Sequence, residues 1–424
     1  MTGPVRPFCV AFLCLSLLAC PGSGTDSGKT GPAAPGRHAE YERRARLIVS
    51  TMTDDELAGQ VMMTGVDGVE RLSAPSRARL LALKPGALLL FGYNLSSSPK
   101  SAASLAADIR SAAAIPTGAS AATIGVLPPF IAIDHEGGDV YRFKGGLTRL
   151  PAARRMGSGA STAEAVSAAA GVAAGTELRA LGVTMNLAPV VEALTAANGA
   201  FLGDRAWSDE PARAATLAAI FIEACQEGGT AAVAKHFPGN AAADPHRGLP
   251  VLRISVAELE RGYFVPFRKA IAAGVAAVML SHAIVPAIDP DLPSSLSARA
   301  IGMLKGKLGF RGIVMTDDLV MAALAGRGGP GAMAVMALSA GADMLMVSGG
   351  KAVPEVRDAL LAALAGGSLS RDRLKDAAAR IVAQKLRFGL DTETDGDRDA
   401  ALAALETTVA RNGAALAGAF AGRD

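Results

Sequence analysis

Cysteine is scarce in this chain, which has four cysteines among 424 residues. Three of them lie within the first 20 residues, so the remaining body has a single thiol, Cys225, and no partner for an internal disulfide. The net charge is also small, at +3, which argues against the broad cationic face that binding to phosphate backbones requires. The composition therefore indicates neither a disulfide-stabilised domain nor a protein that binds nucleic acid.

Histidine is rare as well, with five residues and no H-x-x-x-H spacing, and C-x-x-C is absent. We therefore expect a site that uses neither a metal nor another cofactor. No G-x-G-x-x-G follows the first predicted strand, residues 60–64, so a dinucleotide site is not indicated. Residues 157–161 (GSGAS) do not form the G-x-S-x-G turn of serine hydrolases, because the third residue is glycine, the fifth is serine, and no apolar strand precedes them.

The first 40 residues have the composition of an export signal followed by a tether. Residues 1–19 combine Arg6 with an apolar run that ends at Ala19, a length typical of a signal peptide and too short to span a bilayer. Leu-Leu-Ala before Cys20 resembles the lipobox of bacterial lipoproteins and implies lipidation of Cys20; a plain secretory signal is the alternative. Residues 20–40 are rich in Gly, Pro and Ser, which predicts a flexible tether. We expect an exported lipoprotein of the bacterial cell envelope, anchored in a membrane and facing the periplasm or the exterior.

Residues 41–390 alternate short apolar runs with amphipathic stretches, a pattern typical of parallel strands joined by helices. The eight predicted strands are Gln60–Thr64, Ala87–Phe91, Phe130–Asp134, Val183–Leu187, Thr230–Lys235, Val275–Ser281, Gly312–Asp317 and Ala342–Val347. The clearest predicted helices are Ser161–Leu181, Pro211–Glu227, Ser255–Ala273 and Ser297–Leu308. Eight largely apolar strands favour an α/β fold, a (β/α)8 TIM-type barrel that forms a single catalytic domain; an open doubly wound sheet is the alternative. Residues 391–424 are too few for a second domain and predict a helical tail.

Polar side chains collect where four of the predicted strands end. They are Asp134, Lys235 with His236, Ser281 with His282, and Asp317 with Asp318. Because the carboxyl ends of barrel strands form one rim, where the active sites of such barrels are built, we expect these side chains to share a site. Capping of the following helix could account for a single member such as Ser281 or Asp318. Carboxylates and histidines without a metal favour a carboxylate nucleophile and a separate acid/base, as in retaining glycoside hydrolysis.

Seven short motifs follow one another along the body. They are Met52-Thr-Asp-Asp-Glu-Leu-Ala-Gly-Gln60, Asp134-His-Glu-Gly-Gly138, Gly203-Asp-Arg-Ala-Trp207, Lys235-His-Phe-Pro-Gly239, Asp244-Pro-His246, Ser281-His282 and Thr316-Asp-Asp-Leu319. Their order and spacing resemble glycoside hydrolase family 3, and in particular its bacterial β-N-acetylglucosaminidase (β-hexosaminidase) branch. The resemblance covers residues 45 to 390. It implies a retaining, exo-acting hydrolase that removes terminal GlcNAc from β-linked glycans such as peptidoglycan fragments.

The resemblance also implies a role for individual residues. Asp317 takes the position of the nucleophile, which forms a covalent glycosyl enzyme, and His246 takes that of the acid/base. An imidazole can both give and accept a proton near neutral pH, and Asp244, two residues earlier, could orient the ring. The positions that match those used to bind the sugar are Asp134, Arg205, Lys235 and His236.

Three positions depart from the family pattern. Asn240 stands where a second histidine is usual, and the loop from there to His246 is shorter, which puts the reach of His246 in question. Asp139 and Glu192 stand where arginine and aspartate are usual. The open alternatives are a β-glucosidase or a GlcNAc phosphorylase on the same scaffold, or a lipoprotein that binds glycans without cleaving them. The oligomeric state is left open by the sequence.

Overall fold

The structure, a computed structural model, describes residues 35–96, 98–117, 125–143 and 145–422. Its centre is an eight-stranded sheet with the order β11-β10-β9-β8-β5-β2-β1-β12, in which the paired strands are parallel. The strands are β1 (Met62–Gly65), β2 (Ala87–Leu90), β5 (Phe130–Ile133), β8 (Met185–Asn186), β9 (Ala231–Phe237), β10 (Ala277–Leu280), β11 (Ile313–Thr316) and β12 (Leu345–Val347). They correspond to the eight predicted strands, with shifts at their ends.

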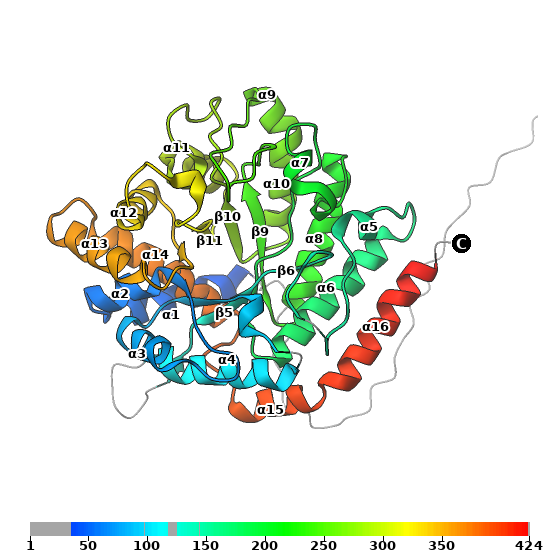
Figure 1. Cartoon of the computed structure of the whole chain (residues 1–424), viewed down its shortest axis with the longest axis horizontal. Coiled ribbons are helices and arrows are strands. Elements are labelled where there is room, and N and C mark those ends of the chain that lie inside the picture. Colours follow the sequence, from blue (N-terminus) through cyan, green and yellow to red (C-terminus); the bar gives the residue numbers. More distant parts are fainter. Residues whose placement is uncertain (1–34, 97, 118–124, 144, 423–424) are drawn as a thin grey trace, which may run out of the picture.

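The sheet curls until its two edge strands meet. The backbone amide of Thr316, the last residue of β11, donates a hydrogen bond to the carbonyl of Met344, directly before β12, at 3.0 Å. Every residue of these strands is buried, which explains why their sequences are apolar rather than alternating. Figure 1 shows the strands at the centre of the molecule and the helices around them. The prediction of a (β/α)8 TIM-type barrel is confirmed.

Helices form the outer layer of the barrel. The longer ones are α1 (Pro35–Ser50), α2 (Asp54–Gln60), α3 (Ala74–Leu83), α4 (Pro99–Ala113), α6 (Ala163–Ala180), α8 (Pro211–Glu227), α10 (Phe264–Ala272), α12 (Pro330–Ala340), α13 (Val353–Ala365), α14 (Arg371–Arg387), α15 (Asp395–Ala403) and α16 (Leu405–Ala421). Shorter ones are α5 (Ala153–Gly157), α7 (Gly199–Leu202), α9 (Val256–Glu258) and α11 (Ala298–Gly302). The predicted helices 255–273 and 297–308 each contain a π-helical turn, η3 (Leu259–Tyr263) and η5 (Met303–Lys307).

Small strands that were not predicted add two hairpins. One pairs β3 (Ile115–Pro116) with β4 (Val126–Leu127), and the other pairs β6 (His135–Gly137) with β7 (Val140–Tyr141). The second hairpin turns through Gly137 and Gly138, whose φ angles of 94° and 58° favour glycine. It follows β5 directly and thus stands at the carboxyl end of the barrel.

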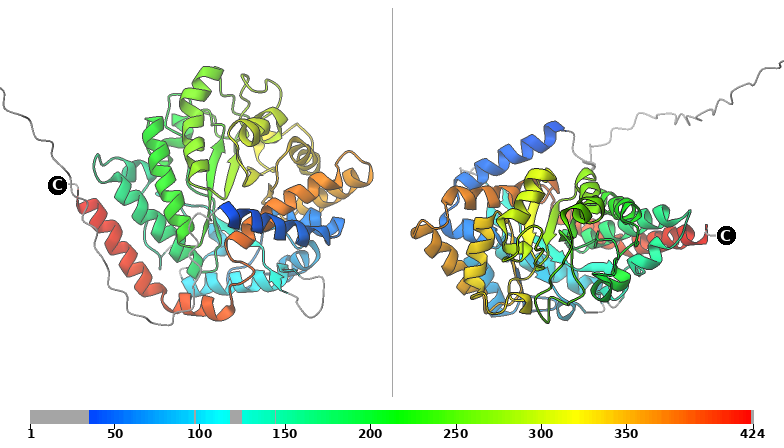
Figure 2. Two further views of the ribbon diagram at one scale, coloured as in Figure 1. Left: turned by 180° about the vertical axis from the view of Figure 1, so that it is seen from behind. Right: turned by 90° about the horizontal axis from the view of Figure 1, so that it is seen from above.

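The two ends of the described chain pack against the barrel. Helix α1 begins at Pro35, inside the predicted tether 20–40, and lies beside α14 (Figure 2). Cys20 and the predicted signal, residues 1–19, lie outside the described residues. Among the described helices, none is both long enough and apolar enough to cross a membrane.

The predicted tail contains two helices, α15 and α16, and α16 runs along the outside of α6 (Figure 1). Buried Glu177 of α6 joins it to the barrel. One carboxylate oxygen accepts from the Thr148 amide at 2.7 Å, and the other accepts from the Thr148 hydroxyl at 2.6 Å and from the Asn412 side chain of α16 at 2.9 Å. The tail is therefore an integral part of the folded body.

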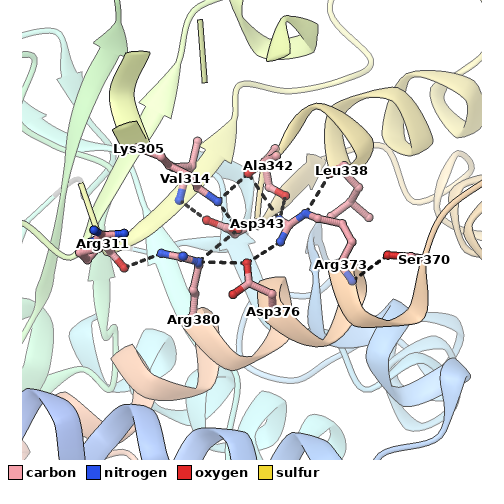
Figure 3. Close-up of polar contacts among 11 residues, drawn as sticks. Lys305, Arg311, Val314, Leu338, Ala342, Asp343, Ser370, Arg373, Asp376 and Arg380 are labelled. Atoms are coloured by element: carbon pink, nitrogen blue, oxygen red, sulfur yellow. Dashed lines mark hydrogen bonds and ion pairs between the residues drawn. The ribbon is translucent and has the colours of Figure 1, made fainter. Parts of the chain in front are cut away.

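A group of charges fastens α14 at the amino end of β12 (Figure 3). The carboxylate of Asp343 is fully buried and accepts hydrogen bonds from Lys305 and Arg373, each at 2.7 Å, and from the Val314 amide at 3.0 Å. Arg380 lies 3.8 Å from the same carboxylate. This end of the barrel is thus held by ion pairs. It lies opposite the rim at the carboxyl ends of the strands, where the predicted site lies.

Candidate active site

A cavity of about 170 Å³ opens at the carboxyl ends of the strands; we call it the active-site cavity. Its lining contains six of the seven residues that were predicted to form the site: Asp134, Arg205, Lys235, His236, His246 and Asp317. The seventh, Asp244, does not line the cavity but contacts His246. Residues in or directly after β5, β9 and β11 therefore meet residues of two further loops at the predicted rim.

Asp317 follows β11 directly and is half-buried in the cavity wall. Burial opposes its ionisation, but the neighbouring His282 and His236, the Asp318 amide and Lys235 together hold the pKa of Asp317 below its ordinary value. One carboxylate oxygen also accepts a hydrogen bond from the Asp318 amide at 2.8 Å. Asp317 is thus an ionised carboxylate that faces the cavity.

The neighbouring Asp318 has a different function. Its carboxylate accepts hydrogen bonds from the backbone amides of Ser348 at 3.1 Å and Val320 at 3.3 Å, and burial raises its pKa. Its carbonyl oxygen accepts from the ring of His282 at 3.0 Å, and the other ring nitrogen of His282 contacts the hydroxyl of Ser295 at 2.7 Å. Asp318 and His282 therefore hold the segment around Asp317 in place, and neither lines the cavity.

His246 projects from the shortened loop, and 69% of its side chain is exposed. The carboxylate of Asp244 accepts from the His246 amide at 2.9 Å and lies 2.8 Å from ring nitrogen Nδ1. The hydrogen bond from the His246 amide is the main reason that the pKa of Asp244 is lowered. Because an ionised carboxylate can only accept, Nδ1 carries a proton and Nε2 is available for proton transfer.

The loop that carries His246 is attached to the segment that follows Asp317. The backbone amide of Ala323 donates to the carbonyl of Pro245 at 3.0 Å. Pro245 and His246 both line the cavity, as Asp317 does. The short loop therefore brings the imidazole to the same cavity as the carboxylate.

The predicted sugar-binding residues are joined by Glu136, which sequence reasoning did not select. Lys235 Nζ contacts Asp134 at 2.8 Å and Glu136 at 2.7 Å. Arg205 donates two hydrogen bonds to Glu136, at 2.8 and 2.9 Å. Burial opposes the charge of Glu136, but Lys235 and Arg205 more than compensate and hold its pKa far below the ordinary value. The side chains of Lys235 and Arg205 are thus held in place by Glu136, and both still line the active-site cavity.

His236 is positioned by Glu192, which the sequence indicated only as a departure from the family pattern. One carboxylate oxygen of Glu192 lies 3.1 Å from the His236 amide and 2.9 Å from its Nδ1. Asn240 donates to the same carboxylate from its backbone amide at 2.6 Å and from its side chain at 2.9 Å. The two departures from the family pattern, Glu192 and Asn240, therefore contact each other and together hold His236.

Two further lining residues were not predicted. Arg142, on the β6–β7 side of the cavity, lies 3.7 Å from Asp134, and Phe201 packs below the guanidinium of Arg205 at 5.4 Å. Glu136 lies inside the motif Asp134-His-Glu-Gly-Gly138, and its charge two residues after Asp134 was the signal that could have indicated it. Among the described residues, no group of three or more His, Cys, Asp or Glu side chains is arranged to hold a metal ion.

Comparisons with known proteins agree with this geometry. Residues 52–384 match the family described as the glycosyl hydrolase family 3 N terminal domain. The β-hexosaminidase of Thiobacillus denitrificans is 35% identical over 309 residues, which are 72% of this chain and 81% of that protein.

Solved structures are similar as well, and two of them show the extent of the match. A family 3 β-N-acetylglucosaminidase from Paenibacillus has a TM-score of 0.73 and 33% identity, and the match covers 86% of this chain and 69% of that one. NagZ from Neisseria gonorrhoeae in complex with N-trifluoroacetyl-D-glucosamine has a TM-score of 0.66 and 28% identity, over 83% of this chain and 98% of that one.

Proposed function

Because this chain belongs to glycosyl hydrolase family 3, we propose that it is a retaining, exo-acting β-N-acetylglucosaminidase. It removes a terminal GlcNAc from the non-reducing end of β-linked glycans. The relatives named β-hexosaminidase and the similar β-N-acetylglucosaminidase structures support this activity, and the complex of NagZ with N-trifluoroacetyl-D-glucosamine supports an N-acylated glucosamine as the terminal sugar. The observation that carries the proposal is a single cavity lined by Asp317 and His246 in a chain of this family.

In the first step, an oxygen of Asp317 attacks the anomeric carbon of the terminal sugar. The bond between that carbon and the leaving oxygen breaks, and His246 Nε2 gives its proton to the leaving oxygen. The lowered pKa of Asp317 keeps this carboxylate ionised and able to attack. The product of the step is a covalent glycosyl enzyme and a free aglycone.

In the second step, His246 Nε2 takes a proton from water while the water oxygen attacks the anomeric carbon. The bond to Asp317 breaks, the carboxylate is regenerated, and the configuration of the sugar is retained. Asp244 keeps the other ring nitrogen protonated in both steps and stabilises the imidazolium that precedes proton donation.

The opposite wall of the cavity binds the hydroxyl groups of the sugar. Asp134 accepts hydrogen bonds from hydroxyls, and Arg142, Arg205 and Lys235 donate them. Nδ1 of His236 is engaged by Glu192, so its Nε2 is the nitrogen that meets the substrate. Hydrogen bonds to charged groups are worth about 1.5 to 3 kcal/mol each, enough for a few of them to select a sugar.

The experiment that tests the proposal compares aryl β-N-acetylglucosaminide with aryl β-glucoside, with and without phosphate. We expect hydrolysis of the first substrate with retention of configuration by NMR, and no requirement for phosphate. Preference for the glucoside, or a sugar phosphate as the product, would instead support one of the alternative enzymes. Equally poor turnover by the wild type and Asp317→Asn would support a protein that binds glycans without cleaving them.

We also propose that a lipid on Cys20 anchors the enzyme to a bacterial membrane, outside the cytoplasm. The lipobox-like Leu-Leu-Ala-Cys20 supports this proposal. The Cys20→Ser variant should move from the membrane fraction to the soluble fraction without loss of activity. Retention of that variant in the membrane fraction would argue against the anchor.

A further inference from the structure

A second cavity, of about 450 Å³, adjoins the active-site cavity and is the larger of the two. Four residues line both cavities and separate them; we call them the partition: Glu136, Val140, Phe201 and Arg205. Beyond the partition, the lining is largely glycine and alanine: Gly137, Gly138, Ala152, Ala153 and Gly203. A methyl group added at Gly203 would have no other atom within 4 Å. Gly137 and Gly138 instead pack closely against Pro151 and Ala152, where an added methyl group would collide, so the open space lies beside Gly203.

The partition is held closed by charge and by ring packing. Arg205 makes its two hydrogen bonds to Glu136, and Lys235 supports Glu136 from the other side. The Arg205 guanidinium also lies over the ring of Phe201. These contacts join the hairpin β6–β7 to the segment of α7 and η2 (Gly203–Arg205), so the partition closes the gap between two loops.

The partition stands across the barrel from the nucleophile. Three strands separate β5 from β11 on either side of the closed sheet, so the ends of these two strands face each other. Asp317 follows β11, whereas Glu136 follows β5. The anomeric carbon has to lie at Asp317, so the other end of the sugar ring, which carries the non-reducing hydroxyls, faces the partition.

We propose that the partition restricts the enzyme to a single sugar on the non-reducing side of the scissile bond, and that the second cavity is a latent subsite for one more N-acetylhexosamine. This inference rests on the proposed function. The second cavity has more room than the one that holds the terminal sugar, and Asp139 and Asp204 at its edge can accept hydrogen bonds from sugar hydroxyls. The exo mode of action thus depends on four side chains.

The test shortens the apolar half of the partition and leaves its charges in place. The variants are Phe201→Ala and Val140→Ala, and the matched control is Leu202→Ala, because Leu202 lines only the second cavity. The substrates are the 4-nitrophenyl β-glycosides of GlcNAc and of the β-1,4-linked GlcNAc disaccharide. Mass spectrometry at early times measures how much intact disaccharide is released relative to GlcNAc.

We expect the wild type and the Leu202 control to release GlcNAc from the disaccharide glycoside. At least one partition variant should raise the share of intact disaccharide by about tenfold. The proposal is wrong if the partition variants cleave the monosaccharide glycoside but still release only GlcNAc from the longer one. It is equally wrong if both of them lose the monosaccharide activity while the control keeps it, since the partition would then be inseparable from sugar binding. Failure of the wild type on both substrates would refute the proposed function instead.

Discussion

Lys385 offers a quantitative test of how the barrel is held together. Its side chain is fully buried in α14, and its ammonium nitrogen contacts one described acceptor, the side-chain oxygen of Gln60 at 2.8 Å. Burial lowers the pKa of Lys385 from 10.5 to about 7. At about 1.36 kcal/mol for each tenfold change in the protonation equilibrium, protonation costs about 4 to 5 kcal/mol more in the folded than in the unfolded protein.

The Lys385→Met variant keeps the length of the side chain and removes the charge. The buried oxygen of Gln60 then loses its donor, at a cost of about 1 to 3 kcal/mol. We therefore expect the variant to be about 2 kcal/mol more stable than the wild type near pH 7.

The pH dependence gives the sign of the effect. The pKa of Lys385 is lower in the folded than in the unfolded protein, so the unfolded chain binds more protons between about pH 7 and pH 10.5. The stability of the wild type should therefore rise with pH in this window, and the advantage of the variant should shrink by about 3 kcal/mol between about pH 7 and pH 9.5.

Urea unfolding followed by circular dichroism measures both effects. Lys351→Met is the matched control, because Lys351 is exposed and its substitution should change stability little at either pH. A variant that is less stable than the wild type near pH 7, or a difference that is the same at both pH values, would refute the reasoning.

Four further substitutions test the site and the fold. Asp317→Asn should lower kcat by at least about a thousandfold with unchanged circular dichroism. His246→Ala should lower kcat by about 10² to 10⁴, and kcat should fall less for an aryl substrate with a good leaving group than for a disaccharide. Glu192→Gln should raise KM more than it lowers kcat, since it weakens the hold on His236. Asp343→Asn should destabilise the fold by about 3 to 5 kcal/mol in urea, because it leaves Lys305 and Arg373 without their buried partner.

The barrel could be predicted because its strands carry a strong local signal. Each is a short run of largely apolar residues, as burial on both faces requires, and four of the runs end in polar residues such as Asp134 and Asp317. The β6–β7 hairpin had no such signal, since its strands are short and contain polar residues such as Glu136. The π-helical turn at 259–263 could not be predicted either, because the apolar periodicity that predicted one helix over 255–273 continues through it.

The residues of the site could be predicted individually, but not the contacts that position them. Motifs placed Arg205 and Lys235 on one rim, whereas their shared partner Glu136 depends on how two loops meet in space. Glu192 and Asn240 were noticed as separate departures from a pattern. Only the folded chain brings them within hydrogen-bond distance, where Asn240 donates two hydrogen bonds to the carboxylate of Glu192.

The bond network around Glu177 bears on where the protein can be shortened. A chain ended at Leu390, where the predicted barrel stops, would lack Asn412 and would leave a carboxylate inside the protein with one donor fewer. The same carboxylate holds Thr148, which lies shortly after the hairpin that supplies Glu136 and Val140. Removal of α15 and α16 should therefore disturb sugar recognition through Glu177 and Thr148, although no residue of those helices lines the cavity.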